Sequence, residues 1–417
     1  MFKIQTFLFL VILPFLSGIS QTIETIEFAG ITKTNPTYLR ALIESKIGNE
    51  LDSLTVEKDV QTLKNLNLFF SVDRAYTINK NGKYALVFKI EEAVYIYPIL
   101  TVSGFKNQFK VQAGCNQINF LGKAQSIGVL YQFYDRHSLS FFYTAPKHSN
   151  GKTGHEFALS KYSTIEPLYS NDTVSSFNFD NYSVSLGGFY WPYKNLRFGL
   201  GGMFMYEKYE QVDQADIGVM GKLFEFNKYQ IRFRTDYMAI NQHYEFREGK
   251  AINFYSEIIQ TEGFPTASFL KFTSDFTYFK RIKQKGNFGF HTKLGISTNN
   301  KSPFSPFVLD GFINVRGIGN RVARGTAEII LNTEYRHTLL KKKYFIAQIA
   351  AFADYGALRE PGGNLATLFN TPETNIFIGG GIRIHSQFIY KTIFRLDFSV
   401  NPTNWMRGFT FGLGQFF

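Results

Sequence analysis

Hydrophobic and polar residues alternate over most of the chain, across residues 96–417. In one such run Leu196, Phe198 and Leu200 fall on one parity, while Arg197 falls on the other. Successive side chains of a β-strand point to opposite faces, so each run predicts a strand with one apolar and one polar face. The 96–417 region is therefore predicted to be mainly β.

Residues 22–95 show a different pattern, in which helical spacing separates short β-runs. Asn35-Pro36 supplies a capping residue followed by a proline suited to the first helical turn. A second helix is predicted from apolar residues at helical spacing that begin near Ser53. Asn81-Gly82 predicts a tight hairpin turn. The predicted order is β-α-α-β-β, with strands at 23–28, 72–78 and 84–90 and helices that start near residues 36 and 53.

The long apolar run of the sequence lies at its N-terminus. Residues 7–16 are apolar, Lys3 precedes them, and the small residues Ser17, Gly18 and Ser20 follow. This order is typical of a secretory signal peptide, and about 10 apolar residues are too few to span a bilayer core. Residues 1–20 are therefore predicted to be a signal peptide cleaved near Ser20, and the mature chain is expected outside the cytoplasm.

Composition favours a membrane barrel over a soluble sandwich for the β-region. Aromatic residues make up 17% of the 417 residues, with 24 Tyr and 46 Phe. Transmembrane barrels carry aromatic girdles at both interfaces and a continuous apolar parity on strands of about ten residues. A bilayer accepts only helices or closed barrels, because an open sheet edge leaves backbone groups unpaired. At roughly 20 residues per strand and connection, residues 96–417 predict about 16 strands.

Charge, cysteine content and motifs narrow the possible chemistry. The net charge is +12, but the 45 Lys and Arg residues are spread along the chain, so nucleic acid is not an expected partner. The single cysteine, Cys115, excludes an internal disulfide. There is no Gly-x-Ser-x-Gly, Cys-x-x-Cys or His-Glu-x-x-His motif, and the seven histidines show no ligand spacing. Neither an enzyme nor a metal site nor a cofactor is predicted.

Four motifs follow one another in the C-terminal part of the β-region. They are Val315-Arg316-Gly317, Glu334-Tyr335-Arg336, Phe352-Ala353-Asp354-Tyr355-Gly356 and Gly379-Gly380-Gly381-Ile382-Arg383. On these motifs the chain resembles the BamA/TamA/FhaC superfamily of outer-membrane proteins, also called the bacterial surface antigen family. Residues 22–95 resemble a POTRA domain, although their pattern alone also fits another small exported α+β domain.

The resemblance implies a bacterial outer-membrane β-barrel with one POTRA domain in the periplasm. It implies that a loop near residues 303–326, which carries Val315, Arg316 and Gly317, folds back into the barrel lumen. The implied function is assembly and insertion of outer-membrane proteins or translocation of polypeptides. The POTRA domain would receive unfolded outer-membrane or secreted polypeptides, and the barrel seam or lumen would pass them.

Outer-membrane lipid is a second expected partner. A periplasm-spanning or lipoprotein partner is compatible with the resemblance. The alternative function is a passive outer-membrane pore or structural barrel.

Strand parity places two carboxylates in the lumen independently of the family resemblance. Glu334 lies on the polar parity of its strand, and Asp354 shares a parity with Gln348 on the next, so both carboxylates are predicted to face the lumen. A guanidinium matches carboxylates with bidentate hydrogen bonds. The hypothesis is that Arg316 pins the infolded loop to Glu334 and Asp354. The alternative is three lumenal charges solvated by water.

The last predicted strand, residues 408–417, has an apolar parity that ends in Phe417. A C-terminal strand that ends in phenylalanine resembles the recognition signal of bacterial outer-membrane barrels; the simpler interpretation is an apolar edge strand that closes on the first. Gly408, Gly412 and Gly414 predict weak pairing at this closure.

The sequence also departs from the family pattern. Ile318 stands where the family usually has an aromatic residue after Val-Arg-Gly, which leaves any stacking role of that position in doubt. Only one POTRA-like unit fits before the barrel, and the short stretch of residues 21–23 is expected to leave no room for a plug helix. No hydrolase domain is expected before the POTRA-like unit.

Overall fold

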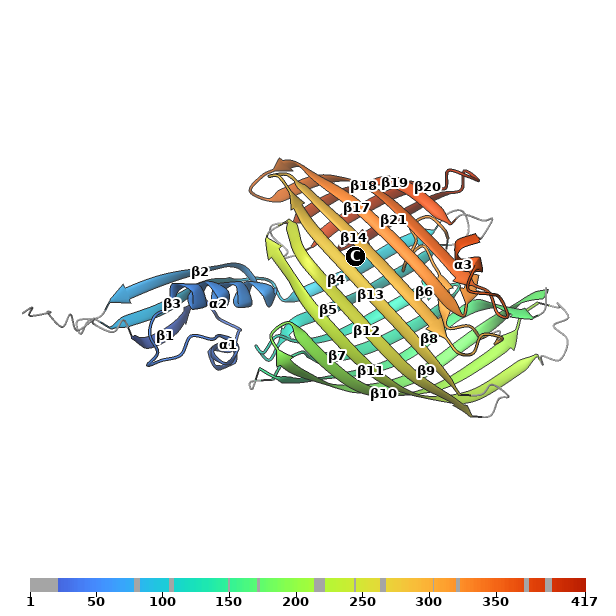
Figure 1. Cartoon of the computed structure of the whole chain (residues 1–417), viewed down its shortest axis with the longest axis horizontal. Helices are drawn as coiled ribbons and strands as arrows, with labels where there is room; N and C mark the ends of the chain where they lie inside the picture. Colours follow the sequence, from blue (N-terminus) through green and yellow to red (C-terminus); the bar gives the residue numbers. More distant parts are fainter. Residues whose placement is uncertain are drawn as a thin grey trace, which may run out of the picture.

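The computed structural model describes most of the chain after residue 21 (Figure 1). The predicted signal peptide at residues 1–20 and the predicted turn at Asn81-Gly82 lie outside the described residues. The described residues are 22–78, 83–104, 109–148, 151–170, 173–213, 222–243, 245–262, 268–302, 304–319, 323–370, 375–386 and 392–417.

A small N-terminal domain lies at one end of a barrel (Figure 1). Its sheet has the order β1-β3-β2, with β1 parallel and β2 antiparallel to β3. Asn35 and Asp52 cap its two helices by accepting backbone hydrogen bonds, as their side chains and positions favour. The predicted β-α-α-β-β order is present. The elements are β1 (Ile23–Ala29), α1 (Pro36–Leu42), α2 (Ser53–Asn65), β2 (Phe69–Ile78) and β3 (Tyr84–Glu92).

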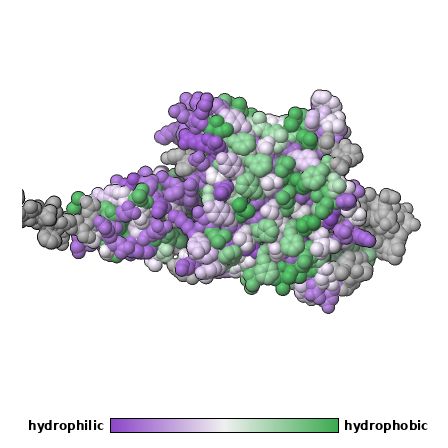
Figure 2. Space-filling model, in the orientation of Figure 1, coloured by the Kyte–Doolittle hydropathy of each residue, from purple (hydrophilic) through white to green (hydrophobic). Residues whose placement is uncertain are grey.

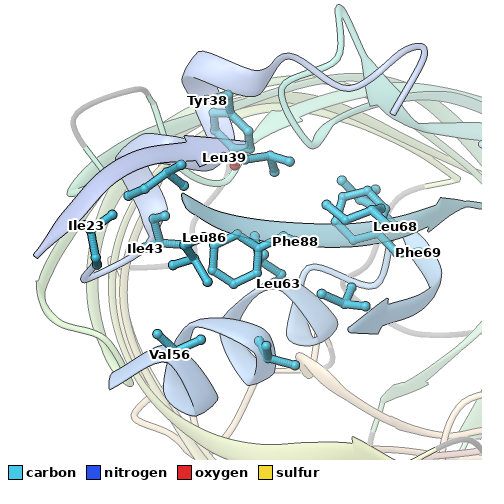
Figure 3. Close-up of a cluster of buried hydrophobic side chains, with 14 of the residues drawn as sticks. Ile23, Tyr38, Leu39, Ile43, Val56, Leu63, Leu68, Phe69, Leu86 and Phe88 are labelled. Carbon is cyan, nitrogen blue, oxygen red and sulfur yellow. The ribbon is translucent and has the colours of Figure 1, made fainter. Parts of the chain in front are cut away.

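An apolar core holds this domain together (Figure 3). Val56 and Leu63 of α2 point toward Leu86 and Phe88 of β3, and all four side chains are fully buried. Leu39 of α1 is buried in the same cluster. The helices thus cover the sheet with the apolar stripes that their spacing predicted.

Sixteen antiparallel strands close the barrel, as predicted. No helix among the described residues is both long enough and apolar enough to cross a membrane. β15 (Phe307–Leu309) and β16 (Ala323–Gly325) pair in the loop between β14 and β17, and α3 (Thr367–Asn370) lies between β18 and β19. The barrel strands are β4 (Ile96–Gly104), β5 (Lys110–Phe120), β6 (Gln125–Tyr134), β7 (Arg136–Ala145), β8 (Thr153–Ser170), β9 (Thr173–Tyr193), β10 (Leu196–Gln211), β11 (Leu223–His243), β12 (Phe246–Glu262), β13 (Phe269–Ile282), β14 (Gly286–Ser297), β17 (Ala327–Lys341), β18 (Phe345–Arg359), β19 (Ile376–Ser386), β20 (Ile393–Val400) and β21 (Arg407–Leu413).

Apolar side chains cover much of the outer face of the barrel, whereas the N-terminal domain has a polar surface (Figure 2). Leu200, Phe233 and Phe398 are all exposed and lie on the parities that the sequence marks as apolar. Charged residues of the opposite parity, such as Asp397, are buried in the interior. The barrel is therefore apolar outside and polar inside, as a membrane barrel requires.

The barrel wall is tall on one side and short on the other. β9 and β11 have 21 residues each, whereas β20 has 8 and β21 has 7. The seam, where β21 meets β4, has the shortest pairing among the described strands of the barrel, with four residue pairs that run from Gly104–Phe409 to Thr101–Gly412. We term the barrel end that bears the N-terminal domain the near end and the opposite end the far end. The seam is paired toward the far end alone, because residues 96–100 of β4 pair with β5 only.

The carboxylate of Glu92 organises the junction between the N-terminal domain and the barrel. It accepts hydrogen bonds from the backbone N–H groups of Thr32 (2.9 Å), Lys33 (3.0 Å) and Thr34 (2.7 Å). Burial acts to raise the pKa of Glu92, but its hydrogen bonds, those from the Thr34 and Thr32 hydroxyls included, outweigh burial and hold the pKa at about 2. The carboxylate therefore stays charged and keeps this segment ordered.

The same segment is bonded to the barrel next to the seam. Asn119 Nδ2 of β5 donates to the Thr34 hydroxyl (2.9 Å), and the Asn35 N–H donates to the carbonyl of Gly122 in the turn after β5 (2.9 Å). β5 is the neighbour of the seam strand β4. The N-terminal domain is thus bonded to the near end of the barrel beside the seam, and it also contacts the tall wall, where Asn65 Nδ2 donates to Asn241 Oδ1 of β11 (3.3 Å).

Candidate functional site

The loop between β14 and β17 is here termed the lumenal loop. Its described residues, 298–302, 304–319 and 323–326, run into the barrel and contact opposite walls. Phe304 packs into an aromatic cluster on the tall wall, and Arg324 forms an ion pair with the fully buried Glu166 of β8. The tip of the loop, residues 310–318, lies against the short wall, where Arg316 is bonded to β17 and β18. The loop therefore crosses the lumen.

Arg316, at the tip, is bonded to two carboxylates of the wall. Its Nε and Nη2 donate to the two oxygens of Asp354 (2.7 and 2.9 Å), and its backbone N–H donates to Asp354 as well (3.1 Å). Its Nη1 donates to Glu334. All three side chains are 1% exposed or less. The structure thus brings together the three residues that the sequence placed in the lumen, with bidentate geometry at Asp354.

Three more strand residues extend this ionic network. Arg383 of β19 donates to Glu334 (3.0 Å) and to Asp397 of β20 (2.5 Å), and Arg336 of β17 donates to the second oxygen of Glu334 (2.6 Å). Arg316 Nη1 lies 3.6 Å from Asp397. Each buried carboxylate is therefore matched by arginine, which offsets the cost of taking these charges out of water.

Two aromatic rings lie against the guanidinium of Arg316. The centroid of the Phe352 ring is 3.6 Å and that of the Phe416 ring is 4.4 Å from Arg316 Cζ. Ile318 does not stack on the arginine but packs with Val315 in a buried apolar cluster. The rings that stack on the arginine thus come from β18 and from the C-terminal tail.

Glycines allow the loop and the wall to approach closely. Gly317 has a φ of +94°, and a Cβ there would lie 2.1 Å from Ser399 Oγ. A Cβ on Gly408 of β21 would lie 2.2 Å from Gly317 Cα, and one on Gly381 would lie 2.2 Å from an Asp397 oxygen. These positions exclude any larger residue unless the backbone moves. Gly381 belongs to the Gly379-Gly380-Gly381 run of the fourth sequence motif.

The C-terminal tail turns into the lumen instead of continuing the last strand. β21 ends at Leu413, and Gly414 follows with a φ of +99°. The ring of Phe417 stacks on that of Phe279 inside the barrel, with 6.1 Å between centroids, and its backbone oxygen accepts from Arg247 (3.2 Å). The predicted strand at 408–417 was therefore too long, because the left-handed turn at Gly414 ends the alternation.

Sequence reasoning left several participants in this site unassigned. Arg336 and Arg383 lie within the quoted motifs, but parity alone did not connect them to Glu334 or Asp397. No sequence pattern placed Phe416 beside Arg316, because the position of Phe416 depends on the turn at Gly414. Among the described residues, no group of three or more His, Cys, Asp and Glu side chains is placed to hold a metal ion.

The comparisons with known proteins agree with this architecture. Residues 21–93 match the family described as POTRA, surface antigen variable number repeat. The fold is similar to that of BamA from Haemophilus ducreyi lacking POTRA domains 1–3, with a TM-score of 0.56, 15% identity, and coverage of 94% of this chain and 84% of that one.

Two CdiB structures are similar as well. CdiB from Acinetobacter baumannii gives a TM-score of 0.58 at 13% identity and covers 94% of this chain and 74% of that one. CdiB from Escherichia coli gives 0.62 at 10% identity, with 94% and 76% covered. No curated protein sequence matches the chain significantly. Residues 21–93 thus match the POTRA family, and the chain as a whole shares its fold with the BamA and CdiB structures.

Proposed function

We propose that this protein assembles or translocates polypeptides at the bacterial outer membrane, with the POTRA domain in the periplasm. The observation that carries the proposal is the seam, which is paired over four residues in a barrel whose other neighbouring strands pair over seven residues or more. The near end of the barrel is then periplasmic, because it bears the POTRA domain.

The near half of β4 offers an edge on which a client strand can form. Residues 96–100 have β5 on one side and no strand on the other within the described structure, because the tail after Leu413 has turned into the lumen. Pro98 lies in this stretch, and proline is tolerated mainly at sheet edges. An extended polypeptide can add to such an edge through main-chain hydrogen bonds.

The POTRA domain presents a second edge of the same kind. β2 is an outer strand of the β1-β3-β2 sheet, and no described strand pairs with its other side. Ile78, at the end of β2, is an exposed apolar side chain. The Glu92 junction fastens this domain to β5, next to the seam. A client held on β2 is therefore kept close to the edge of β4.

Quantitative proteomics of the outer membrane and cell surface after depletion of the protein tests this function. Loss of many barrel proteins would indicate general insertion, and loss of one exported protein would indicate a dedicated transporter. Unchanged client levels together with steady open conductance of the purified protein would favour a passive pore and contradict the proposal.

Complementation with Arg316→Ala connects the function to the site. Client levels are expected to fall as they do after depletion, because the loop loses its bonds to Asp354 and Glu334. Arg316→Lys keeps the charge but loses the bidentate geometry, so partial complementation is expected. Arg232→Ala is the matched control, since Arg232 lies on the tall wall and its partner Glu257 keeps Lys271 (2.8 Å).

A further inference from the structure

The lumenal loop is attached to the wall on both sides of the seam. On one side Arg316 is bonded to the strands that lead to β21, and Gly317 touches Gly408 of β21 itself. On the other side Asp310 lies 3.5 Å from Lys110 Nζ at the start of β5. Lys110 is 2% exposed and Asp310 is fully buried. The tip thus spans the seam from inside.

Both attachments lie at the paired part of the seam. Lys110 is the register partner of Ser103 across β5 and β4, and Ser103 is the register partner of Thr410 across the seam. Gly408 is two residues from Thr410 on β21. The lumenal loop therefore lies on the inner side of the four residue pairs of the seam. It contacts β5 on one flank and β21 on the other.

Asp310 is held in place to receive the lysine. Its Oδ1 accepts from the backbone N–H of Phe312 (2.8 Å), and its own N–H donates to Asn314 Oδ1 (2.9 Å). The Lys110 ammonium also lies 4.6 Å from the centroid of the Phe312 ring, within the range of a cation–π contact. The carboxylate and the ring therefore form a preorganised seat for one buried cation.

The two attachments differ in strength. Arg316 makes three bonds of 2.7 to 3.1 Å to Asp354 and another to Glu334, whereas the ion pair of Lys110 with Asp310 spans 3.5 Å. Bidentate arginine pairs are stronger and more rigid than a single lysine contact. The loop is therefore expected to stay with the Arg316 flank when the two flanks separate.

We propose that Lys110 is a positioning residue that clamps the seam shut through Asp310, and that the seam opens by release of this pair while Arg316 keeps the loop on the β17–β21 flank. This inference rests on the proposed function, since seam opening is the step that it controls. In the closed barrel the lumenal loop holds the two flanks of the seam together.

Hydrogen–deuterium exchange of the full-length protein in lipid nanodiscs, without client, tests the clamp. In Lys110→Met the amides of residues 101–104 and 409–412 are expected to exchange at least tenfold faster than in the wild type. The Arg316 amide, which donates to Asp354, is expected to keep its protection. The double variant Lys110→Met/Asp310→Asn removes the buried carboxylate charge together with the lysine, so it serves if Lys110→Met folds poorly.

The control is Lys228→Met, which removes a partly buried lumenal lysine that pairs with Glu207 (2.6 Å) on the tall wall. This control is expected to leave exchange at the seam unchanged. The charge swap Lys110→Asp/Asp310→Lys is expected to restore part of the protection of the seam amides. Unchanged seam exchange in Lys110→Met, or equal acceleration in all strands, would overturn the clamp. Because no client is present, this result is independent of the outcome of the proteomics.

Discussion

The two walls of the barrel are built in different ways. On the tall wall, strands such as β9 and β11 have 21 residues, and ion pairs join side chains of adjacent strands, as with Lys228 and Glu207. On the short wall, β20 and β21 have 8 and 7 residues, and the charges of several strands converge on Arg316 of the lumenal loop. The tall wall is held together by long pairings between its own strands, whereas the short wall depends on contacts with the lumenal loop.

This difference shows how a closed barrel can be stable and still open at one place. Long ladders lose many hydrogen bonds at once if they separate, so the tall wall stays closed. The seam has few pairs to lose, and the loop supplies the missing stability through contacts that can be released separately. The following changes are expected to affect the short wall and to spare the tall wall.

The largest effect is expected for Arg316→Ala. The substitution leaves Asp354 without its bidentate partner, and breaking a buried pair in this way costs about 3–5 kcal/mol. Arg232→Ala on the tall wall is expected to cost about 0–1 kcal/mol, because Arg232 is partly exposed. Denaturant unfolding in lipid vesicles measures both, and equal losses would remove the distinction between the walls.

A smaller effect is expected for Gly408→Ala. The new Cβ would lie 2.2 Å from Gly317 Cα, so the loop must move, and overpacking of this kind costs about 1–3 kcal/mol. Gly202→Ala is the matched control on the tall wall, where the nearest atom lies 3.9 Å away. Heat-induced unfolding followed by gel mobility compares the two variants. A lower unfolding temperature for Gly202→Ala than for Gly408→Ala would contradict the close approach.

Phe416→Ala is expected to weaken the site by about 1 kcal/mol, because the ring lies over the Arg316 guanidinium. Phe416→Leu keeps an apolar side chain and separates the ring contribution from packing. Hydrogen–deuterium exchange of residues 310–318 is expected to rise in Phe416→Ala and less in Phe416→Leu. If neither variant changes exchange in the loop, the tail does not support the arginine.

A similarly small effect is expected at the junction, for Glu92→Gln. The pKa of Glu92 falls from 4.5 to about 2 on folding, so the charged carboxylate stabilises the junction above pH 4.5, and this stability is lost as the pH falls toward 2. Glu92→Gln should therefore lower stability by about 1 kcal/mol at pH 7, with a difference that shrinks below pH 4.5. Calorimetry at several pH values measures this, and a constant difference would contradict the assignment.

Strand parity was sufficient for part of the site. Glu334 and Asp354 lie on the polar parity of long alternating runs, so their direction into the lumen followed from the period of two. Their contact with Arg316 required only that the loop fold inward. The strand count followed from length, because the long strands of the tall wall and the short strands next to the seam average to the assumed spacing.

Other features depend on registers and turns that single-strand patterns do not contain. Lys110 and Asp310 are 200 residues apart, and neither lies in a motif. Their contact follows from closure of β21 on β4, which brings β5 beside the loop tip. The tail was predicted as strand because Phe409 and Phe411 alternate regularly, whereas the left-handed Gly414 overrides the pattern.

The central claim is that the seam must open for clients to be handled. A disulfide between Val102→Cys and Phe411→Cys, which are register partners across the seam, tests it in a Cys115→Ser background. Register partners in antiparallel strands lie within the Cα separation that a disulfide spans. The account predicts that the oxidised protein fails to restore the proteins lost on depletion and that reduction restores them. Equal restoration in both states would contradict it.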